Sequence, residues 1–192
     1  MSENILNFLN GTVTKYLIPG IVRLEKLRPQ GPEDLSACAI PTAMLLFAIV
    51  DLFGYLLRED SRRPNVSETE KNLRAIFKHP LAKFSPEYTE RVQTLSGLFR
   101  NGLMHQIFPK AAGIRKAGNT PQLFDRFGAR DHLNVDRFSA DVLIMIRNLC
   151  ECLPAPEWIE LREQMSERLD RITQCDFKEM ESKRTAEKKR FP

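Results

Sequence analysis

Apolar residues recur at intervals of three and four along most of the chain, which is the period of an amphipathic helix. The clearest stripe has spacings of four, three, four and four and consists of Tyr88, Val92, Leu95, Phe99 and Leu103. Two later segments, over 135–153 and 158–172, repeat in the same way. Because short connections between such helices favour antiparallel neighbours, we expect an all-α fold, an up-and-down helical bundle of at least five helices.

Local signals mark where two of these helices begin and end. Ser67 and Glu70 have the spacing of a capping box, which predicts a helix from there to about His79, with Pro80 as its stop. Ser85 is followed by a proline, the typical pair of an N-cap and a first helical position. The helix that Ser85 opens would carry the stripe over 88–103.

The segment over 35–57 is almost entirely apolar and carries one formal charge, Asp51. It is just long enough to cross a bilayer. A charge at that depth would cost about 2.5–3.5 kcal/mol on insertion, and Pro41 interrupts the start of the run. We therefore predict a buried helix of a soluble protein, with Pro41 in its first turn and no membrane partner.

The helical stripes also predict the core and the domain limits. The bundle would run over 35–175, after an N-terminal helical segment over 1–34 and before a basic C-terminal tail over 176–192. We expect the core to contain large apolar side chains from the main helices, namely Leu45, Leu46, Ile49, Val92, Leu95, Phe99, Val142, Ile146, Leu161 and Leu169.

The least regular part of the chain, over 109–134, is broken by glycines and a proline and is basic. Its cations exceed its carboxylates by three, with Lys110, Arg115, Lys116, Arg126 and Arg130 against Asp125 and Asp131. A short hairpin around Gly118 and Asn119 is the largest sheet that we expect in the protein.

Composition narrows the class of protein. Of the 192 residues, 42% are hydrophobic and 28% charged, which excludes collagenous, disordered and coiled-coil proteins. The four cysteines have no paired spacing, so we place the protein in a reducing cytoplasm. The net charge is +4, and residues 178–192 supply +3 of it, so we expect a solvated basic tail rather than a global basic footprint for nucleic acid.

The common catalytic and metal-binding motifs are missing from the sequence. It contains no glycine-rich phosphate loop and no HExxH, CxxC or GxSxG motif. Cys150 and Cys152 are two apart on a predicted helix and point roughly 200° away from each other. His79, His105 and His132 fall on three different elements. We therefore expect neither a metal nor a cofactor.

One polar cluster near the end of the 88–103 helix stands out. Arg100, Asn101 and His105 all miss the apolar stripe, and at about 100° per residue Arg100 and His105 lie on opposite flanks, about 140° apart. Asn101 and His105 are i, i+4 neighbours, so the amide can hold the tautomer and orientation of the imidazole.

Arg100-Asn101-xxx-His105 resembles the Rx4–6H motif of HEPN domains (higher eukaryotes and prokaryotes nucleotide-binding). The resemblance implies an all-α HEPN-like bundle that forms a homodimer with the motif at its interface. It implies a metal-independent endoribonuclease, a toxin or defence protein that an antitoxin or regulatory partner controls. The irregular basic insertion after the motif helix is longer than a minimal bundle requires.

The residues also fit this chemistry on their own. His105 can take the proton of a ribose 2′-OH as a base with a pKa near 7, and Arg100 can stabilise the phosphorane as a bidentate phosphate donor. Lys110, Arg115 and Lys116 are the candidate RNA-binding residues. Two alternatives remain: a non-catalytic HEPN-like module for nucleotide or RNA binding or for dimerisation, and an unrelated helical protein in which Arg100 and His105 are ordinary surface residues.

Overall fold

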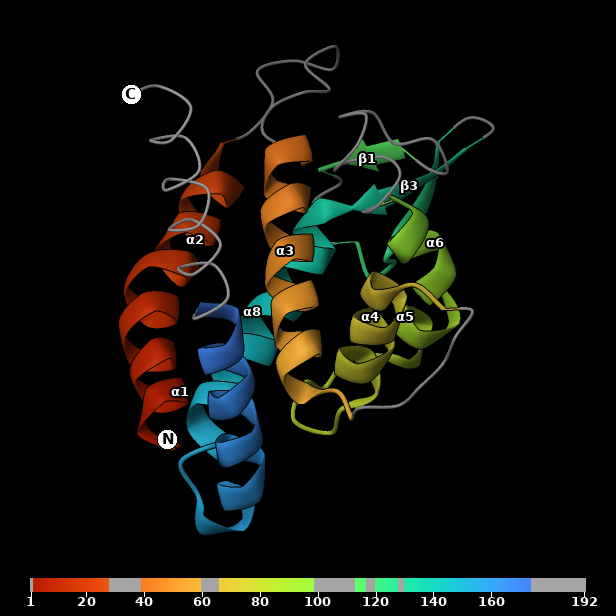
Figure 1. Ribbon diagram of the computed structural model, residues 1–192. Helices are drawn as coiled ribbons and strands as arrows, with labels where there is room; N and C mark the ends of the chain where they lie inside the picture. The colour runs from red at the N-terminus through yellow and green to blue at the C-terminus, as the bar shows by residue number, and fades with distance from the viewer. Residues whose placement is uncertain are drawn as a thin grey trace, which may run out of the picture.

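The structure is a computed structural model that describes residues 2–27, 39–59, 66–98, 113–116, 120–127 and 130–173. The protein is mostly helical, with a small sheet at one end of the helices (Figure 1). Its helices are α1 (Ser2–Phe8), the π-helix η1 (Leu9–Leu17), α2 (Ile18–Lys26), α3 (Ala39–Leu57), α4 (Glu68–Lys78), α5 (Pro86–Glu90), α6 (Val92–Gly97), α8 (Val135–Cys152), the 3-10 helix η3 (Pro156–Trp158) and a last helix over 159–173. Its strands are β1 (Gly113–Arg115), β2 (Phe124–Phe127) and β3 (Arg130–Asn134).

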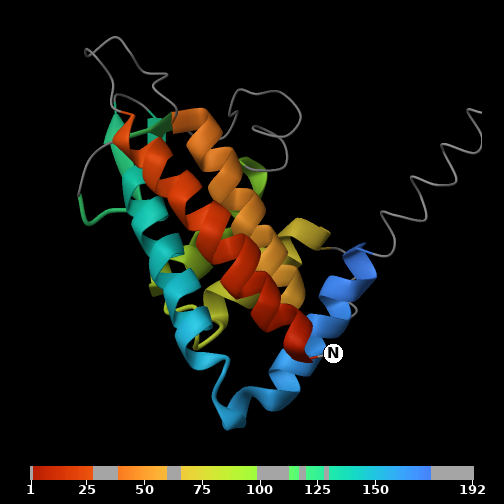
Figure 2. The same cartoon turned by 90° about the vertical axis from the view of Figure 1, so that its left-hand side faces the viewer.

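The first three helical elements follow one another without a break and form one N-terminal rod over 2–26. Its middle part is a nine-residue π-helix, in which the Thr14 hydroxyl donates to the carbonyl of Leu9, five residues back, at 2.9 Å. The rod lies between α3 and α8 (Figure 2). Its fully or almost fully buried residues join the same core as the rest of the helices: Ile5, Leu9, Val13 and Ile21.

Helix α3 stands at the centre of the fold and packs against α4, α8, α2 and β1 (Figure 1). Its most apolar window has a mean hydropathy of 2.0, so by length and composition the helix could cross a membrane. The core helices of soluble proteins can have the same length and hydropathy. Just over half of that window is buried inside the protein. Its charge, Asp51, accepts a hydrogen bond from the Asn72 amide of α4 at 3.0 Å, so this carboxylate has a partner within the protein.

The predicted start and end of α4 are confirmed. The Ser67 hydroxyl accepts from the backbone N–H of Glu70 at 3.2 Å, α4 begins at the next residue, and His79 follows its last residue. Pro41 lies in the first turn of α3, as expected. The residue that opens α5, Ser85, has the extended backbone of an N-cap and is followed by the expected proline.

The helix that Ser85 opens is not continuous, contrary to the expectation from its stripe. Arg91 leaves the helical region, with φ −96° and ψ 9°, and separates α5 from α6. The stripe itself is correct, because Tyr88, Val92 and Leu95 are all buried. Apolar spacing therefore predicted the inward face but not the break.

The expectation of no sheet beyond a hairpin near Gly118 and Asn119 is wrong. The structure has a three-stranded sheet in the order β1-β3-β2, in which β3 is antiparallel to β2 and parallel to β1. The antiparallel pair is β2 with β3, whereas Gly118 and Asn119 themselves lie outside the described residues. A three-residue strand such as β1 is too short to show an alternation of apolar and polar residues. It forms a strand because it pairs with β3, a segment further along the chain.

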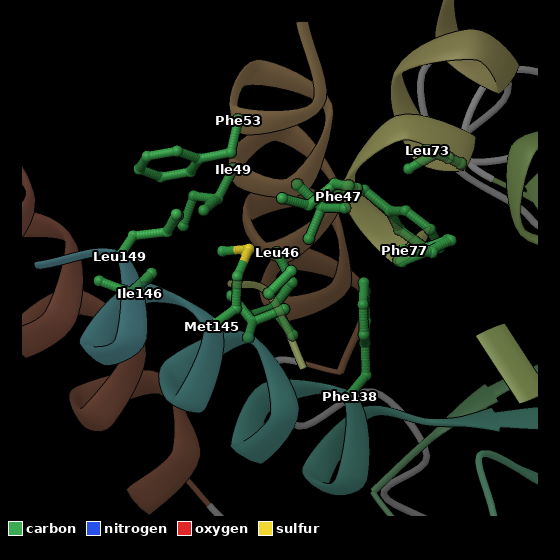
Figure 3. Packing of buried hydrophobic residues seen from close by; sticks show 14 of the residues in the cluster. Leu46, Phe47, Ile49, Phe53, Leu73, Phe77, Phe138, Met145, Ile146 and Leu149 are labelled. Carbon is green, nitrogen blue, oxygen red and sulfur yellow. The ribbon is translucent and has the colours of Figure 1, made fainter. Parts of the chain in front are cut away.

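The core lies between α3 and the helices on either side of it. Figure 3 shows Leu46, Ile49 and Phe53 of α3 toward α8, and Phe47 beside α4. The rings of Phe47 and Phe138 lie 4.9 Å apart. Of the predicted core, most are buried (Leu46, Ile49, Val92, Leu95, Val142, Ile146 and Leu169), two pack against the core while partly exposed (Leu45 and Leu161), and Phe99 lies outside the described residues.

After α8 the chain turns back through η3 into the last helix, as the antiparallel expectation requires (Figure 2). The guanidinium of Arg162 holds this turn by donating to the carbonyls of Leu153 at 2.6 Å and Ala155 at 2.9 Å. A second arginine, Arg168, is 6% exposed and donates to the carbonyls of Tyr55 and Arg58 at the end of α3. The last helix is thereby fixed to the end of the central one.

Candidate functional site

The motif residues Arg100, Asn101 and His105 lie outside the described residues, as does Lys110. The structure describes the chain on both sides of them. Helix α6 is followed by Leu98, which is fully buried, and the chain is described again from β1. Both α6 and β1 lie at the end of the molecule that carries the sheet (Figure 1). The described chain before and after the predicted site residues therefore lies at this end of the fold.

Arg91, at the break between α5 and α6, reaches the sheet. Its guanidinium lies 3.9 Å from the carboxylate of Asp131 on β3, and its centre is 5.7 Å from the centre of the Phe124 ring on β2. The Arg91 and Asp131 side chains are both about half exposed, so the ion pair contributes little stability. Together the two contacts join the helix before the motif to the strands after it.

The predicted RNA-binding residue Arg115 is held by a buried carboxylate. It donates to Asp125 at 3.1 Å, and the Asp125 side chain is only 8% exposed. The hydroxyl of Thr120 donates to the same carboxylate at 3.4 Å and accepts from the amide of Asn134 at 2.8 Å. Asn134 also accepts from the backbone N–H of Arg137, so it caps α8. The guanidinium of Arg115 is thus positioned within the protein, and its role toward RNA stays a prediction.

The other described candidate, Lys116, bonds to the end of α2. Its ammonium donates to the carbonyls of Leu24 at 2.5 Å and Leu27 at 2.7 Å. These carbonyls lie at the negative end of the helix dipole, where a cation is favourable. Lys116 therefore ties the strand that follows the motif to the N-terminal rod, which is a structural role that its sequence position did not reveal.

His132, on β3, lies opposite Gly113 of β1, and its ring covers the glycine. A Cβ at position 113 would collide with the imidazole. This close approach explains a glycine at the start of β1. Within the described ranges, no three His, Cys, Asp or Glu side chains come together in a way that could hold a metal ion.

Among the described residues, Tyr88 is the largest fully buried side chain with an ionisable group. Its hydroxyl donates to Asp141 of α8 at 2.7 Å, and Arg137 donates to the same carboxylate at 2.8 Å. Burial, with the neighbouring Asp141 carboxylate, raises the pKa of Tyr88 well above 10. This triad keeps the phenol protonated and joins α5 to α8, so its role is structural.

His79 sits at the end of α4, half-buried, with its ring centre 6.3 Å from that of Trp158. Its Nδ1 accepts from the backbone N–H of Leu81 at 3.3 Å, so Nε2 carries the proton in the neutral ring. Burial lowers the pKa of His79 below its ordinary 6.5. The ring is thus a neutral acceptor in the native protein.

A pH-dependent loss of stability should follow from this histidine. Its pKa is lower in the native than in the unfolded chain, so its contribution is present above pH 6.5 and is lost as the pH falls through the native pKa. His79→Asn keeps an acceptor for Leu81 without titrating. Urea unfolding at pH 7.5 and pH 5.5 should show the wild-type free energy of unfolding falling relative to that of the variant. An equal change in both proteins would contradict the assignment.

Sequence reasoning missed the polar contacts that build this end of the molecule. Asp125 and Arg91 were not predicted as contacts of the site region, and the run Phe124-Asp125-Arg126-Phe127 has no period-2 alternation that would have marked β2 as a strand. Comparison with protein-family models, with curated proteins and with solved structures finds no match for this chain.

Proposed function

We propose that the protein is a metal-independent endoribonuclease of HEPN type, with Arg100, Asn101 and His105 as its catalytic residues. The observation that carries the proposal is the Arg100-Asn101-xxx-His105 motif directly after a buried amphipathic stripe in a mostly helical chain. The described neighbours support it, since α6 and β1, which precede and follow the motif in the sequence, both lie at the end of the fold that carries the sheet. The predicted RNA-binding residue Arg115 lies at the same end, where it is paired with Asp125.

The proposed reaction needs one base and one phosphate donor. His105 takes the proton of the ribose 2′-OH, the 2′ oxygen forms a bond to phosphorus, and the bond from phosphorus to the 5′ oxygen breaks. The leaving 5′ oxygen takes up a proton, so the products are a 2′,3′-cyclic phosphate and a 5′-OH. Arg100 donates to the phosphoryl oxygens as their charge grows, and Asn101 holds the imidazole in place.

We propose that two copies form the working unit. One chain supplies one histidine and one arginine, while a two-fold dimer with the motifs facing each other supplies two of each around one cleft. Light scattering at tens of micromolar should then give twice the chain mass of 22.1 kDa. A monomer at that concentration would count against the ribonuclease and favour a non-catalytic RNA-binding module.

The assay for the activity uses purified protein with a mixed RNA pool. Cleavage should persist in EDTA, and the fragments should end in 2′,3′-cyclic phosphate and 5′-OH groups. Such an enzyme fits a toxin or defence protein that a partner protein holds inactive in the cell. Metal-dependent cleavage, or fragments that carry 5′-phosphates, would contradict the proposed chemistry.

A further inference from the structure

The N-terminal rod presents cations and an aromatic ring to solvent along its second half. Lys15, Arg23 and Lys26 are exposed, and Tyr16 is 73% exposed. Across the described part of the chain, these four side chains make no hydrogen bond or ion pair. Many other cations are paired, including Arg58, Arg74, Arg91, Arg115, Arg137 and Arg171.

Helix α8 runs beside the rod in the opposite direction (Figure 2). The hydroxyl of Ser139 donates to Glu25 at 2.5 Å, and Cys150 is hydrogen-bonded to Thr14. The two contacts are eleven residues apart on each helix. This register places Arg147 of α8 close to the level of Tyr16 and Leu17.

The register places a fourth cation, on α8, level with the middle of the rod. Arg147 is exposed and has no partner among the described residues. The rod's carboxylate in this half, Glu25, turns to Ser139 of α8 rather than to these cations. On α8 the next exposed carboxylate, Glu151, comes one turn beyond Arg147. We call Lys15, Tyr16, Arg23, Lys26 and Arg147 the rod strip.

One end of the rod strip adjoins the proposed catalytic end of the molecule. Lys116, directly after β1, bonds to the carbonyls of Leu24 and Leu27, so Arg23 and Lys26 lie on the helix turns next to that strand. From Lys15 to Lys26 the rod extends for about 16 Å at 1.5 Å per residue, which is room for several nucleotides.

We propose that the rod strip binds the backbone of single-stranded RNA, with Tyr16 as a stacking platform, and leads the strand toward β1, the first described strand after the motif in the sequence. This rests on the proposed function, and it adds the path of the substrate. Unpaired cations flanking an exposed aromatic ring are the arrangement that binds single strands without reading sequence. Binding to an anionic membrane would require a continuous apolar face. On the rod, the exposed Arg23 and Lys26 separate Tyr16 from the apolar Leu27.

The test measures binding of the full-length protein to a labelled 2′-O-methyl RNA of about 16 nucleotides. This probe lacks the free 2′-OH that the proposed reaction requires, so binding is read separately from cleavage. Arg23→Gln/Lys26→Gln removes two charges from the strip. Lys78→Gln/Lys83→Gln is the matched control, because it removes two exposed, unpaired charges elsewhere, and Lys26 and Lys78 both lie in the last turn of a helix.

The strip double variant should bind RNA more weakly than the wild type. The slope of log affinity against log salt concentration should become less steep by about 1.4, since each lost phosphate contact removes about 0.7. Tyr16→Ala should weaken binding roughly five- to hundredfold with the slope unchanged. The control should keep the wild-type affinity and slope. Equal losses in the control, unchanged RNA binding in the strip variants, or a loss confined to binding of phosphatidylserine vesicles would each overturn the proposal.

The same proteins separate the two proposals. Wild-type protein that binds the probe through the strip but cuts no RNA would support the strip and contradict the ribonuclease. Wild-type protein that cuts RNA, with strip variants that bind and cut equally well, would support the ribonuclease and contradict the strip.

Discussion

Replacing His105 with alanine should lower the rate of RNA cleavage by a factor of about 10² or more, because general acid–base catalysis contributes about that much. The affinity for a 2′-O-methyl RNA should survive, since the imidazole acts on the reacting proton rather than as the main phosphate contact. Single-turnover cleavage of a labelled RNA measures the rate, and circular dichroism checks that the helices are retained.

The control for this variant is His79→Asn, which changes a histidine placed at the end of α4 beside Trp158. It should cut RNA at the wild-type rate near neutral pH. Cleavage by His105→Ala at the wild-type rate would eliminate the proposed site.

Arg100 should behave differently from His105, because a phosphate contact acts in both the ground and the transition state. Arg100→Ala should therefore weaken both binding and cleavage. Arg100→Lys should restore only part of each, since the ammonium keeps the charge but loses the bidentate fork.

The helices were predictable because their signals are local. The Ser67 hydroxyl caps the backbone three residues later, and the stripe residues Tyr88, Val92 and Leu95 all face the core. Both features are set by spacings within one or two turns. The break at Arg91 was not predictable from the same stripe, because both halves of the interrupted helix keep the stripe facing the core.

The sheet depends on contacts between segments that are distant in the sequence, which the spacing of apolar residues within one segment cannot predict. Gly113 pairs with His132, and the missing Cβ makes room for the imidazole. A three-residue strand acquires its structure from such a partner. The insertion therefore looked like a basic loop in the sequence, although it holds a sheet.

The candidate site shows the same division. The motif was found from residues five apart in the sequence, Arg100 and His105. The partners that determine what neighbouring cations can do are distant in the sequence: Lys116 bonds to the carbonyls of Leu24 and Leu27 at the end of α2. A basic residue in the sequence is thus a candidate for RNA binding only until its intramolecular partners are known.

The close approach of α4 to Gly54 should make this position of α3 intolerant of a side chain. A Cβ at Gly54 of α3 would collide with the backbone carbonyl of Asn72 on α4, which cannot rotate away as a side chain can. Moving α4 outward would also strain the hydrogen bonds of the Asn72 side chain to Asp51 and Arg58, both at 3.0 Å. Gly54→Ala should therefore lower the free energy of unfolding by about 2 kcal/mol, within the range for overpacked cores, despite the better helix propensity of alanine.

Gly20→Ala is the matched control, because Gly20 is also helical but a Cβ there meets nothing within 4 Å. It should raise the free energy of unfolding by about 0.5–1 kcal/mol through helix propensity alone. Urea unfolding at pH 7 measures both, and the melting temperatures should move in opposite directions, down by about 4–8 °C for Gly54→Ala. The sign of the change in the free energy of unfolding tests the contact. A Gly54→Ala protein as stable as the wild type would show that α3 and α4 do not approach each other this closely. It would also show that the contact between Asp51 and Asn72 does not fix their packing.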